Sequence, residues 1–414
     1  MRILYLALIL AAGIGVFLFF GRTGTIEVTV DPVSSANLNV PEATTSGTAA
    51  KPAGVKTTTK LADIENQKPL ANPPKVIKAI YLTSWSGGSA TRIKYLINLA
   101  KTTQVNAAVI DIKDYSGYVA YDIGVPDVIK YNAKEIRIPL INTLIKQLHD
   151  AGIYVIARVT IFQDPRLALA RPDLTVKSKK TGGSWLDNKK INWIDPAAKD
   201  AWDYDIAIAK DAASRGFDEI NFDYIRFPSD GDLNDMSFTF WDGKSSKSSV
   251  LKSFFKYLRE QMGETKLSAD LFGLAAINHD DLGIGQVIEN AYQYFDFVCP
   301  MVYPSHYANG FLGYKNPALY PYEVVKYSLD AGVKRLMAGI PQPTTGSSTT
   351  VASSTVAASV PFRAKLRPWL QDFNLGATYD AAMVGKEIQA VEDSLTGDNF
   401  SGWLMWNPSN VYSL

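Results

Sequence analysis

From about residue 76 onward, apolar residues fall into short runs that alternate with longer amphipathic stretches. Each short run has the length and the β-branched or aromatic content of a strand. The longer stretches, such as 93–100 and 141–148, repeat their apolar residues at the three-to-four spacing of a helix. The short runs predict eight strands: 76–82, 107–112, 154–159, 219–223, 266–270, 295–301, 365–370 and 402–406.

Eight strands separated by helices predict an α/β fold, the (β/α)8 or TIM barrel, in which the helices surround a closed parallel sheet. A doubly wound open sheet is the alternative, because an alternating pattern does not by itself show that the sheet closes. The last predicted strand ends close to Leu414, so we expect the eighth helix to be missing or replaced. Part of the segment before Val76 is a candidate to cover that face.

The first 75 residues differ in composition from the rest. Arg2 is followed by an uninterrupted apolar run, 3–20, which is long enough to span a bilayer. We predict a membrane-anchored protein with an uncleaved signal anchor (a transmembrane helix) over 1–21 and its body extracytoplasmic; a cleaved signal peptide is the alternative. Residues 22–75, rich in Thr, Ser, Ala and Pro, are predicted to form a flexible linker with a reach of roughly 40 Å. The barrel then spans 76–414, with a low-complexity loop insertion at 341–361.

Composition and charge limit the classes of partner and chemistry. With 47% hydrophobic and 20% charged residues, the chain can build a large core. A net charge of +1 without a long Lys/Arg block argues against a nucleic-acid partner. Cys299, the single cysteine, lies in an apolar run and excludes an intramolecular disulfide and a cysteine zinc site. The three histidines are scattered, and we expect neither a metal nor a cofactor.

The run 216–231 is the most informative segment for function. Within it, Ile220 and Phe222 can face one side of a strand while Asn221 and Asp223 face the other, and a Pro/Gly loop follows. A carboxylate at the end of a buried strand is costly unless a partner or a function holds it there. Asp223 is therefore the first candidate for chemistry.

Polar and aromatic residues gather at the carboxyl ends of the predicted strands, where active sites of such barrels lie. A structural explanation competes at three of these positions. Asp114 and Asp372 are also suited to cap helices, and Arg158 is suited to neutralise an inward carboxylate. The candidate substrate-binding residues are Trp85, Asp111, Lys113, Arg158, Arg226, Tyr303, His306, Asp372, Trp406 and Asn407.

Acids, amides and flat aromatic rings together favour a carbohydrate site. Hydrolysis of a glycosidic bond needs two carboxyl groups that flank it, and Asp223 and Asp270 end neighbouring strands. We assign Asp270 as the acid, because its sequence context is the more apolar. Asp223, with Arg226 nearby, is assigned as the ionised nucleophile or base. The chain has no G-x-S-x-G, G-x-x-x-x-G-K or H-E-x-x-H motif and no G-x-G-x-x-G after a strand, so other common chemistries compete poorly.

Several segments make the chain resemble a known family. They include FDEINFDYIRFP at 217–228, SADLFG at 268–273, PMVYPSHY at 300–307 and GWLMWNPSN at 402–410. Over residues 78–412 the chain resembles a family of bacterial envelope proteins that are assigned by inference to the glycoside hydrolases, with a barrel related to the α-amylase superfamily. The resemblance to α-amylases implies a nucleophile at Asp223. The chain departs from them at Asn221, where they have Arg, and at Asp270, where their acid is Glu; Asp372 is the candidate for their third acid.

Chitinase-like barrels are the nearest alternative relatives. Met301 and Tyr303 match the Met-x-Tyr of their sixth strand, and Trp406 matches the aromatic residue at the barrel floor. Their fourth strand ends with an acid Glu, where this chain has Ile225. A substrate-assisted mechanism would therefore lack its proton donor, and we expect a similar architecture without that mechanism.

Together these features predict a barrel that hydrolyses a polysaccharide or glycan outside the cytoplasm. A catalytically inactive glycan-binding envelope protein is the alternative function. A purely structural role in the envelope ranks third.

Overall fold

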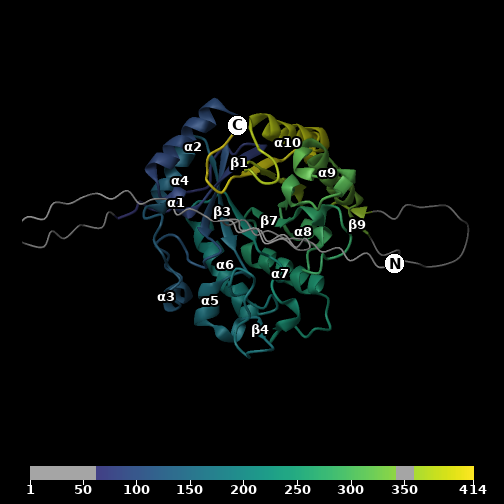
Figure 1. Ribbon diagram of the computed structural model, residues 1–414. Helices are drawn as coiled ribbons and strands as arrows, with labels where there is room; N and C mark the ends of the chain where they lie inside the picture. The colour runs from purple at the N-terminus through teal and green to yellow at the C-terminus, as the bar shows by residue number, and fades with distance from the viewer. Residues whose placement is uncertain (1–61, 342–358) are drawn as a thin grey trace, which may run out of the picture. The chain divides into compact units, whose positions relative to one another are not determined.

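The computed structural model describes residues 62–341 and 359–414 (Figure 1). The predicted signal anchor, most of the predicted linker and most of the predicted loop insertion lie outside these residues. Within the described part, no helix is long and apolar enough to cross a membrane.

The main sheet is parallel and closes into a barrel. Its nine strands fill eight positions, because β11 and β12 are two pieces of one strand that is interrupted at Pro368, which has no amide hydrogen to donate. β1 pairs with both β13 and β2, and the pairing of β7 with β8 completes the ring. The predicted barrel is confirmed, and the open doubly wound sheet is wrong. The barrel strands are β1 (Ile77–Leu82), β2 (Ala107–Lys113), β3 (Tyr154–Thr160), β5 (Glu219–Asp223), β7 (Leu267–Phe272), β8 (Phe297–Met301), β11 (Lys365–Leu366), β12 (Trp369–Gln371) and β13 (Gly402–Trp406).

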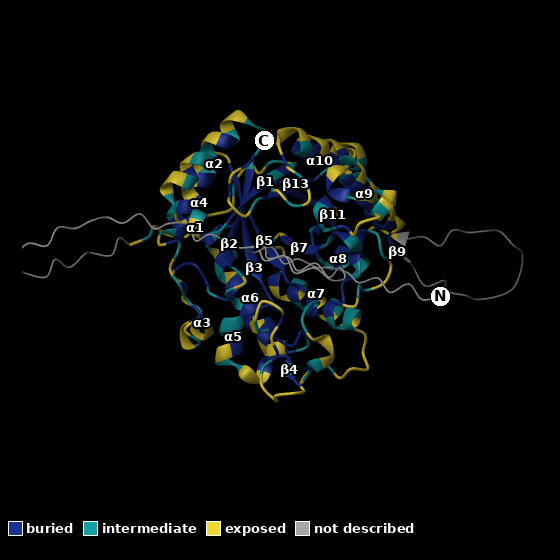
Figure 2. Cartoon of the chain, viewed as in Figure 1, coloured by how far each residue is buried: buried dark blue, intermediate teal, exposed yellow. Residues whose placement is uncertain are grey.

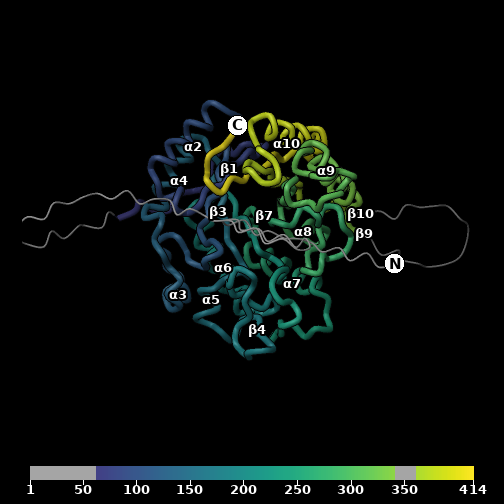
Figure 3. The backbone as a smooth tube through the Cα atoms, in the orientation of Figure 1, coloured from purple at the N-terminus to yellow at the C-terminus, as the bar shows by residue number. Residues whose placement is uncertain are grey.

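Helices surround the strands, and their buried residues face inward (Figures 1 and 2). One long helix follows each of the first seven strand positions. The described residues after β13, 407–414, contain no helix, as expected. This final segment lies beside β1, where the Tyr412 hydroxyl donates a hydrogen bond to the Tyr81 carbonyl oxygen (Figure 3). The long helices are α2 (Ala90–Thr102), α4 (Ile141–Asp150), α6 (Lys199–Ser214), α7 (Lys247–Met262), α8 (Ile288–Tyr294), α9 (Pro321–Ala338) and α10 (Ala381–Ser394).

Smaller elements lie in the loops. β4 (Lys177–Ser178), from the loop after β3, pairs antiparallel with β6 (Met236–Ser237), from the loop after β5. β9 (Ile340–Pro341) and β10 (Ser359–Val360) pair at the two ends of the predicted insertion. The short helices α1 (Ser84–Gly87), α3 (Pro126–Lys130) and α5 (Pro165–Ala170) follow β1, β2 and β3.

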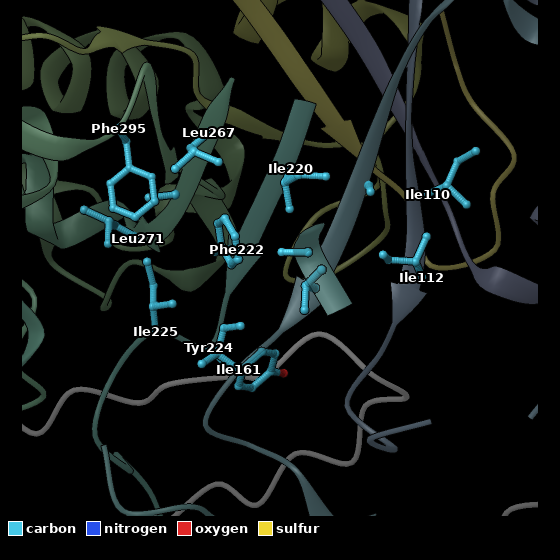
Figure 4. Close-up of a cluster of buried hydrophobic side chains, with 14 of the residues drawn as sticks. Ile110, Ile112, Ile161, Ile220, Phe222, Tyr224, Ile225, Leu267, Leu271 and Phe295 are labelled. Carbon is cyan, nitrogen blue, oxygen red and sulfur yellow. The ribbon is translucent and has the colours of Figure 1, made fainter. Parts of the chain in front are cut away.

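Side chains alternate between the barrel interior and the helix layer along each strand, which decides where the polar residues point. On β5, Ile220 and Phe222 pack outward in the same apolar cluster as Leu267 and Phe295 (Figure 4). By the two-residue period of a strand, Glu219, Asn221 and Asp223 must then point into the barrel. The outward packing of two apolar residues is thus what places Asp223 inside.

Residues 63–70 form a strap that runs from the start of α4 to the start of β5. The Asp63 carboxylate accepts hydrogen bonds from the backbone N–H of Asn142, at 2.7 Å, and of Thr143, at 3.0 Å, and so caps α4 from a distant part of the chain. At the other end of the strap, the Leu70 N–H donates to Asp218 Oδ1 at 2.6 Å, and its side chain packs against the barrel interior. This part of the predicted linker therefore contacts the barrel, but at α4 and the start of β5 rather than at the face beside β13.

Candidate active site

One guanidinium lies at the centre of the carboxyl-terminal end of the barrel. Arg158, on β3, donates to Asp111 Oδ1 at 2.5 Å and also to Asp223 Oδ2. Its Nε lies 3.7 Å from Asp270 Oδ2. All four residues are buried. Three carboxyl groups from β2, β5 and β7 therefore converge on a single cation.

The strand register explains this convergence. Arg158 pairs with Asp111 on one side and with Asn221 on the other, so the three side chains point inward at one level. Phe222 pairs with Ala269 on β7, which makes Asp223 and Asp270 the next neighbours in the same direction. Neighbouring strands lie about 4.8 Å apart, so these two carboxyl groups face the same small space.

Asp223 sits at a strained turn. The next residue, Tyr224, has φ of +55°, which is uncommon for an aromatic residue and costs on the order of 1 kcal/mol. At this turn the Tyr224 N–H donates to Asp223 Oδ1 at 2.6 Å. With the guanidinium on Oδ2, each oxygen of Asp223 accepts a hydrogen bond from a fixed donor.

Asp270 occupies a different environment. Its Oδ1 accepts hydrogen bonds from Asn221 Nδ2 at 2.8 Å and from Trp369 Nε1 at 2.7 Å. Burial, and then the negative charge of Asp223, raise the pKa of Asp270 to about 8, against the opposing effect of Arg158. Asp270 is therefore largely protonated at neutral pH. The proton belongs on Oδ2, because Oδ1 already accepts two donors.

Asp111 and two aromatic rings form the side of the cluster nearest β1. The Tyr81 hydroxyl donates to Asp111 Oδ2 at 2.5 Å, and burial raises the pKa of Asp111 to about 6. The Tyr81 ring stacks on Trp406 with centroids 3.9 Å apart and planes at 22°. The Arg158 guanidinium lies 5.3 Å from the centre of the Trp406 ring. A flat aromatic surface thus adjoins the three acids.

Tyr303 and His306 line the opposite side. Burial and the charges of Asp270 and Asp223 raise the pKa of Tyr303 well above its usual value, which keeps the phenol protonated. His306 lies edge-on to Tyr303 with ring centroids 5.2 Å apart. Burial lowers the pKa of His306 to about 4, so its imidazole is neutral at neutral pH. Tyr303 and His306, both predicted to bind substrate, are therefore uncharged groups that can form hydrogen bonds.

Lys113 lies apart from these residues. A register shift between Asp111 and Lys113 turns this lysine away from the barrel interior, toward α6. Its ammonium lies 2.7 Å from Asp164 and 3.0 Å from Asp205, and it also donates to the Thr160 carbonyl at 2.6 Å. This buried ion-pair group gives Lys113 a structural role instead of the predicted contact with substrate.

Arg226 is also held away from the carboxylates. Its guanidinium lies 4.6 Å from the centre of the Trp193 ring and 4.8 Å from that of Phe272, and it donates to Ser229 Oγ at 2.8 Å. The cation that neutralises Asp223 is therefore Arg158, rather than Arg226 as the sequence suggested.

Three predicted residues remain. Asp372 and Asn407 contact the C-terminal segment, and Trp85 lies at the rim of the barrel mouth. Asp372 accepts from the Ser413 N–H at 2.7 Å, and Asn407 donates to the Val411 carbonyl at 2.6 Å, so both hold the C-terminal segment in place. Asp372 is therefore not placed to act as a third acid. Trp85 lies at the rim of the barrel mouth with 63% of its surface exposed.

Three residues of the cluster were absent from the predicted site. Tyr81 and Trp369 lie on strands that were predicted correctly, and Asn221 was predicted to share a strand face with Asp223. The alternation along the strand could have identified Asn221, because it shares its side with Asp223. Among the described residues, no group of His, Cys, Asp or Glu is arranged to hold a metal ion; the three carboxyl groups surround a guanidinium instead.

Comparison with protein families identifies the class of the barrel. A family model described as "Putative glycosyl hydrolase domain" matches residues 79–412, which include every residue of the cluster described above. The chain belongs to this family. The match confirms the resemblance seen in the sequence motifs and places the chain among the proposed glycosyl hydrolases. Among curated proteins, none matches the chain.

Solved structures similar to this glycosyl hydrolase family member include both close and distant sequences. A hypothetical protein from Ruminiclostridium thermocellum ATCC 27405 is 42% identical over 50% of this chain and 98% of its own, with a TM-score of 0.44. The glycoside hydrolase domain of PelA from Pseudomonas aeruginosa is 11% identical, with 82% and 98% covered and a TM-score of 0.42. TtGalA, an alpha-galactosidase from Thermus thermophilus, is 11% identical, with 64% and 50% covered and a TM-score of 0.40. These scores are too low for the activity of any of the three to be transferred.

Proposed function

We propose that this protein hydrolyses the glycosidic bonds of an extracytoplasmic polysaccharide or glycan, with Asp223 and Asp270 as its catalytic pair. The observation that supports this most strongly is the contrast between two adjacent carboxyl groups. Arg158 and a backbone N–H donate to the two oxygens of Asp223, whereas burial raises the pKa of Asp270 to about 8. Glycoside hydrolysis requires such a pair, one acid and one base or nucleophile.

Asp270 is the proposed general acid. Because its pKa is raised to about 8, it carries a proton at neutral pH and can donate that proton to the departing glycosidic oxygen. Asp223 is the proposed nucleophile or base, acting on the sugar carbon directly or through a water molecule. Its two hydrogen-bond donors fix its orientation, so little reorganisation is needed when it reacts.

The rest of the cluster suits a positively charged transition state. Asp111 and Asp223 together carry more negative charge than Arg158 neutralises, and a net negative site favours an oxocarbenium-like sugar. The stacked rings of Tyr81 and Trp406 offer a flat surface for the apolar face of that sugar. Tyr303, whose hydroxyl stays protonated, is available to donate a hydrogen bond to a sugar oxygen.

An inactive glycan-binding protein is the second candidate, and the burial of Asp270 favours it. Only 1% of Asp270 is exposed, and its Oδ1 is already occupied by two donors. If Asp270 cannot reach a glycosidic oxygen, the same residues would bind a sugar without cleaving it.

The extracytoplasmic location rests on the sequence. The apolar run 3–20 after Arg2 is long enough for a signal anchor, and the Thr/Ser/Pro-rich stretch beyond it would hold the barrel away from the membrane. Protease accessibility of the barrel in intact cells tests this location. Protection of the barrel until the cells are lysed would contradict it.

Release of reducing sugar from a panel of envelope and storage polysaccharides tests the activity. Asp223→Asn and Asp270→Asn should each lower the rate about a thousandfold, because each removes one half of the acid–base pair. Asp372→Asn is the matched control, since it makes the same change at a strand end outside the cluster and should leave the rate unchanged. Turnover that survives in Asp223→Asn would reject the assignment, whereas binding without any product from the unmutated protein would favour the glycan-binding candidate.

A further inference from the structure

Trp85 is the one exposed tryptophan of this chain. Its side chain is 63% exposed, whereas the other seven tryptophans are buried or half-buried, all of them within the described residues. It lies on α1, four residues after Tyr81, whose hydroxyl contacts Asp111 in the cluster. An exposed indole therefore stands at the rim of the proposed catalytic site.

A fixed arginine supports the Trp85 ring. The guanidinium carbon of Arg137 lies 5.1 Å from the centre of the ring, and only 5% of the arginine side chain is exposed. This guanidinium cannot swing away, because it donates four hydrogen bonds. The acceptors are Ser84 Oγ at 3.1 Å, Asp114 Oδ2 at 2.5 Å, Ser116 Oγ at 3.1 Å and Glu135 Oε2 at 2.6 Å.

The backbone fixes the same geometry a second time. A Cβ added to Gly88 would lie 1.9 Å from the Arg137 carbonyl oxygen, and one added to Gly87 would lie 3.0 Å from Ile138 Cδ1. The end of α1 thus packs against residues 137–138 with no room for a side chain. The backbone that carries Trp85 is therefore held against residues 137–138, which keeps the indole within reach of the Arg137 guanidinium.

A second ring stands on the next loop. Tyr115 is 43% exposed and directly follows Asp114, the residue that accepts from Arg137. The loops after β1 and β2 therefore each present an aromatic ring at the rim, and one guanidinium joins the two loops. Rigid aromatic rings among charged groups suit sugars, which offer an apolar face for stacking and hydroxyl groups for hydrogen bonds.

We propose that Trp85 and Tyr115 form a sugar-binding platform at the rim, separate from the catalytic cluster, that holds further units of the same glycan. The substrate is then a chain of several sugars rather than a mono- or disaccharide. The substrate class rests on the proposed hydrolase function, whereas glycan binding by the platform does not require turnover.

Binding of defined polysaccharides separates these two statements. The full-length chain in detergent, carrying Asp223→Asn to prevent cleavage, is titrated with chitin, cellulose, amylose and purified peptidoglycan. Trp85→Ala should raise Kd for the bound polymer about tenfold, the loss of one well-placed ring contact. Tyr327→Ala, which removes a 46% exposed ring on α9, is the matched control and should leave Kd unchanged.

The dependence of Kd on oligosaccharide length separates sugar binding by Trp85 from a merely structural role, which would not produce such a dependence. With oligosaccharides of the bound polymer, the effect of Trp85→Ala should disappear for a disaccharide and grow with length. The platform would be overturned if Trp85→Ala bound every polymer as tightly as the protein with Trp85 intact. It would also be overturned if the wild type bound none of the four polymers. Weaker binding by Trp85→Ala together with no cleavage by the wild type would uphold the platform and reject the hydrolase.

Discussion

Replacing Arg158 with Met should destabilise the barrel strongly, because three buried carboxyl groups share this one cation. The side chain of Arg158 is 6% exposed, donates to Asp111 at 2.5 Å and to Asp223, and lies 3.7 Å from Asp270. Removing one partner of a buried ion pair costs about 3–5 kcal/mol, since the remaining charge stays buried without compensation. We therefore expect a loss of that size in the free energy of unfolding near pH 8.

The same loss should shrink as the pH falls. Burial raises the pKa of Asp111 to about 6 and that of Asp270 to about 8, and the charge of Arg158 opposes both shifts, so both pKa values should rise further in the variant. A carboxyl group with a higher pKa in the folded state binds more protons when folded. The folded state is therefore stabilised as the pH decreases toward the unfolded pKa of about 4. At about pH 5 the variant should recover much of its lost stability.

Urea unfolding followed by tryptophan fluorescence at about pH 8 and about pH 5 measures both effects. Arg171→Met is the matched control, because Arg171 also contacts two carboxylates, Asp173 at 2.7 Å and Asp200 at 2.9 Å, but at the surface. It should cost at most about 1 kcal/mol. A loss of that small size for Arg158→Met, or an equal loss at the two pH values, would refute this description of the cluster.

Three further predictions concern the strap, the buried lysine and the acid. Asp63→Ala should remove the cap of α4 and lower the free energy of unfolding by about 1 kcal/mol, as read from the urea midpoint; an unchanged midpoint would show that the strap contributes nothing. Lys113→Met should cost about 3–5 kcal/mol, because Asp164 and Asp205 would stay buried without their cation, yet kcat per folded molecule should not change; a selective loss of kcat would place Lys113 at the site after all. The pH profile of kcat/KM should fall above about pH 8 as Asp270 loses its proton, and a profile that stays flat to about pH 10 would contradict its role as the acid.

The fold was predictable because the barrel strands are short, apolar and regularly spaced. Each of the eight predicted strands corresponds to a strand position of the barrel, including 365–370, which the structure divides at Pro368 into β11 and β12. Closure was harder to predict, since it depends on the pairing of the first strand, β1, with the last, β13, and strand pairing leaves no mark in a single sequence.

The candidate site was predictable only in part. Asp223 and Asp270 were identified because a carboxyl group at the end of an apolar strand stands out. Lys113 was misplaced because a register shift after Asp111 reverses the side on which the next residues emerge, and one irregular residue is enough to do this. Arg158 was recognised as a partner for a carboxylate, but its contacts with three acids follow from the register of three strands, which the sequence does not reveal.

The most direct test of the proposed mechanism compares two substrates that carry the same sugar but differ in their leaving group. One is the natural glycan and the other is the corresponding glycosyl fluoride. A good leaving group needs no proton, so Asp270→Asn should lose activity on the glycan and keep most of it on the fluoride, while Asp223→Asn should lose both. Loss of both activities in Asp270→Asn, or full activity of Asp223→Asn on the fluoride, would contradict the division of roles between Asp270 as acid and Asp223 as nucleophile or base.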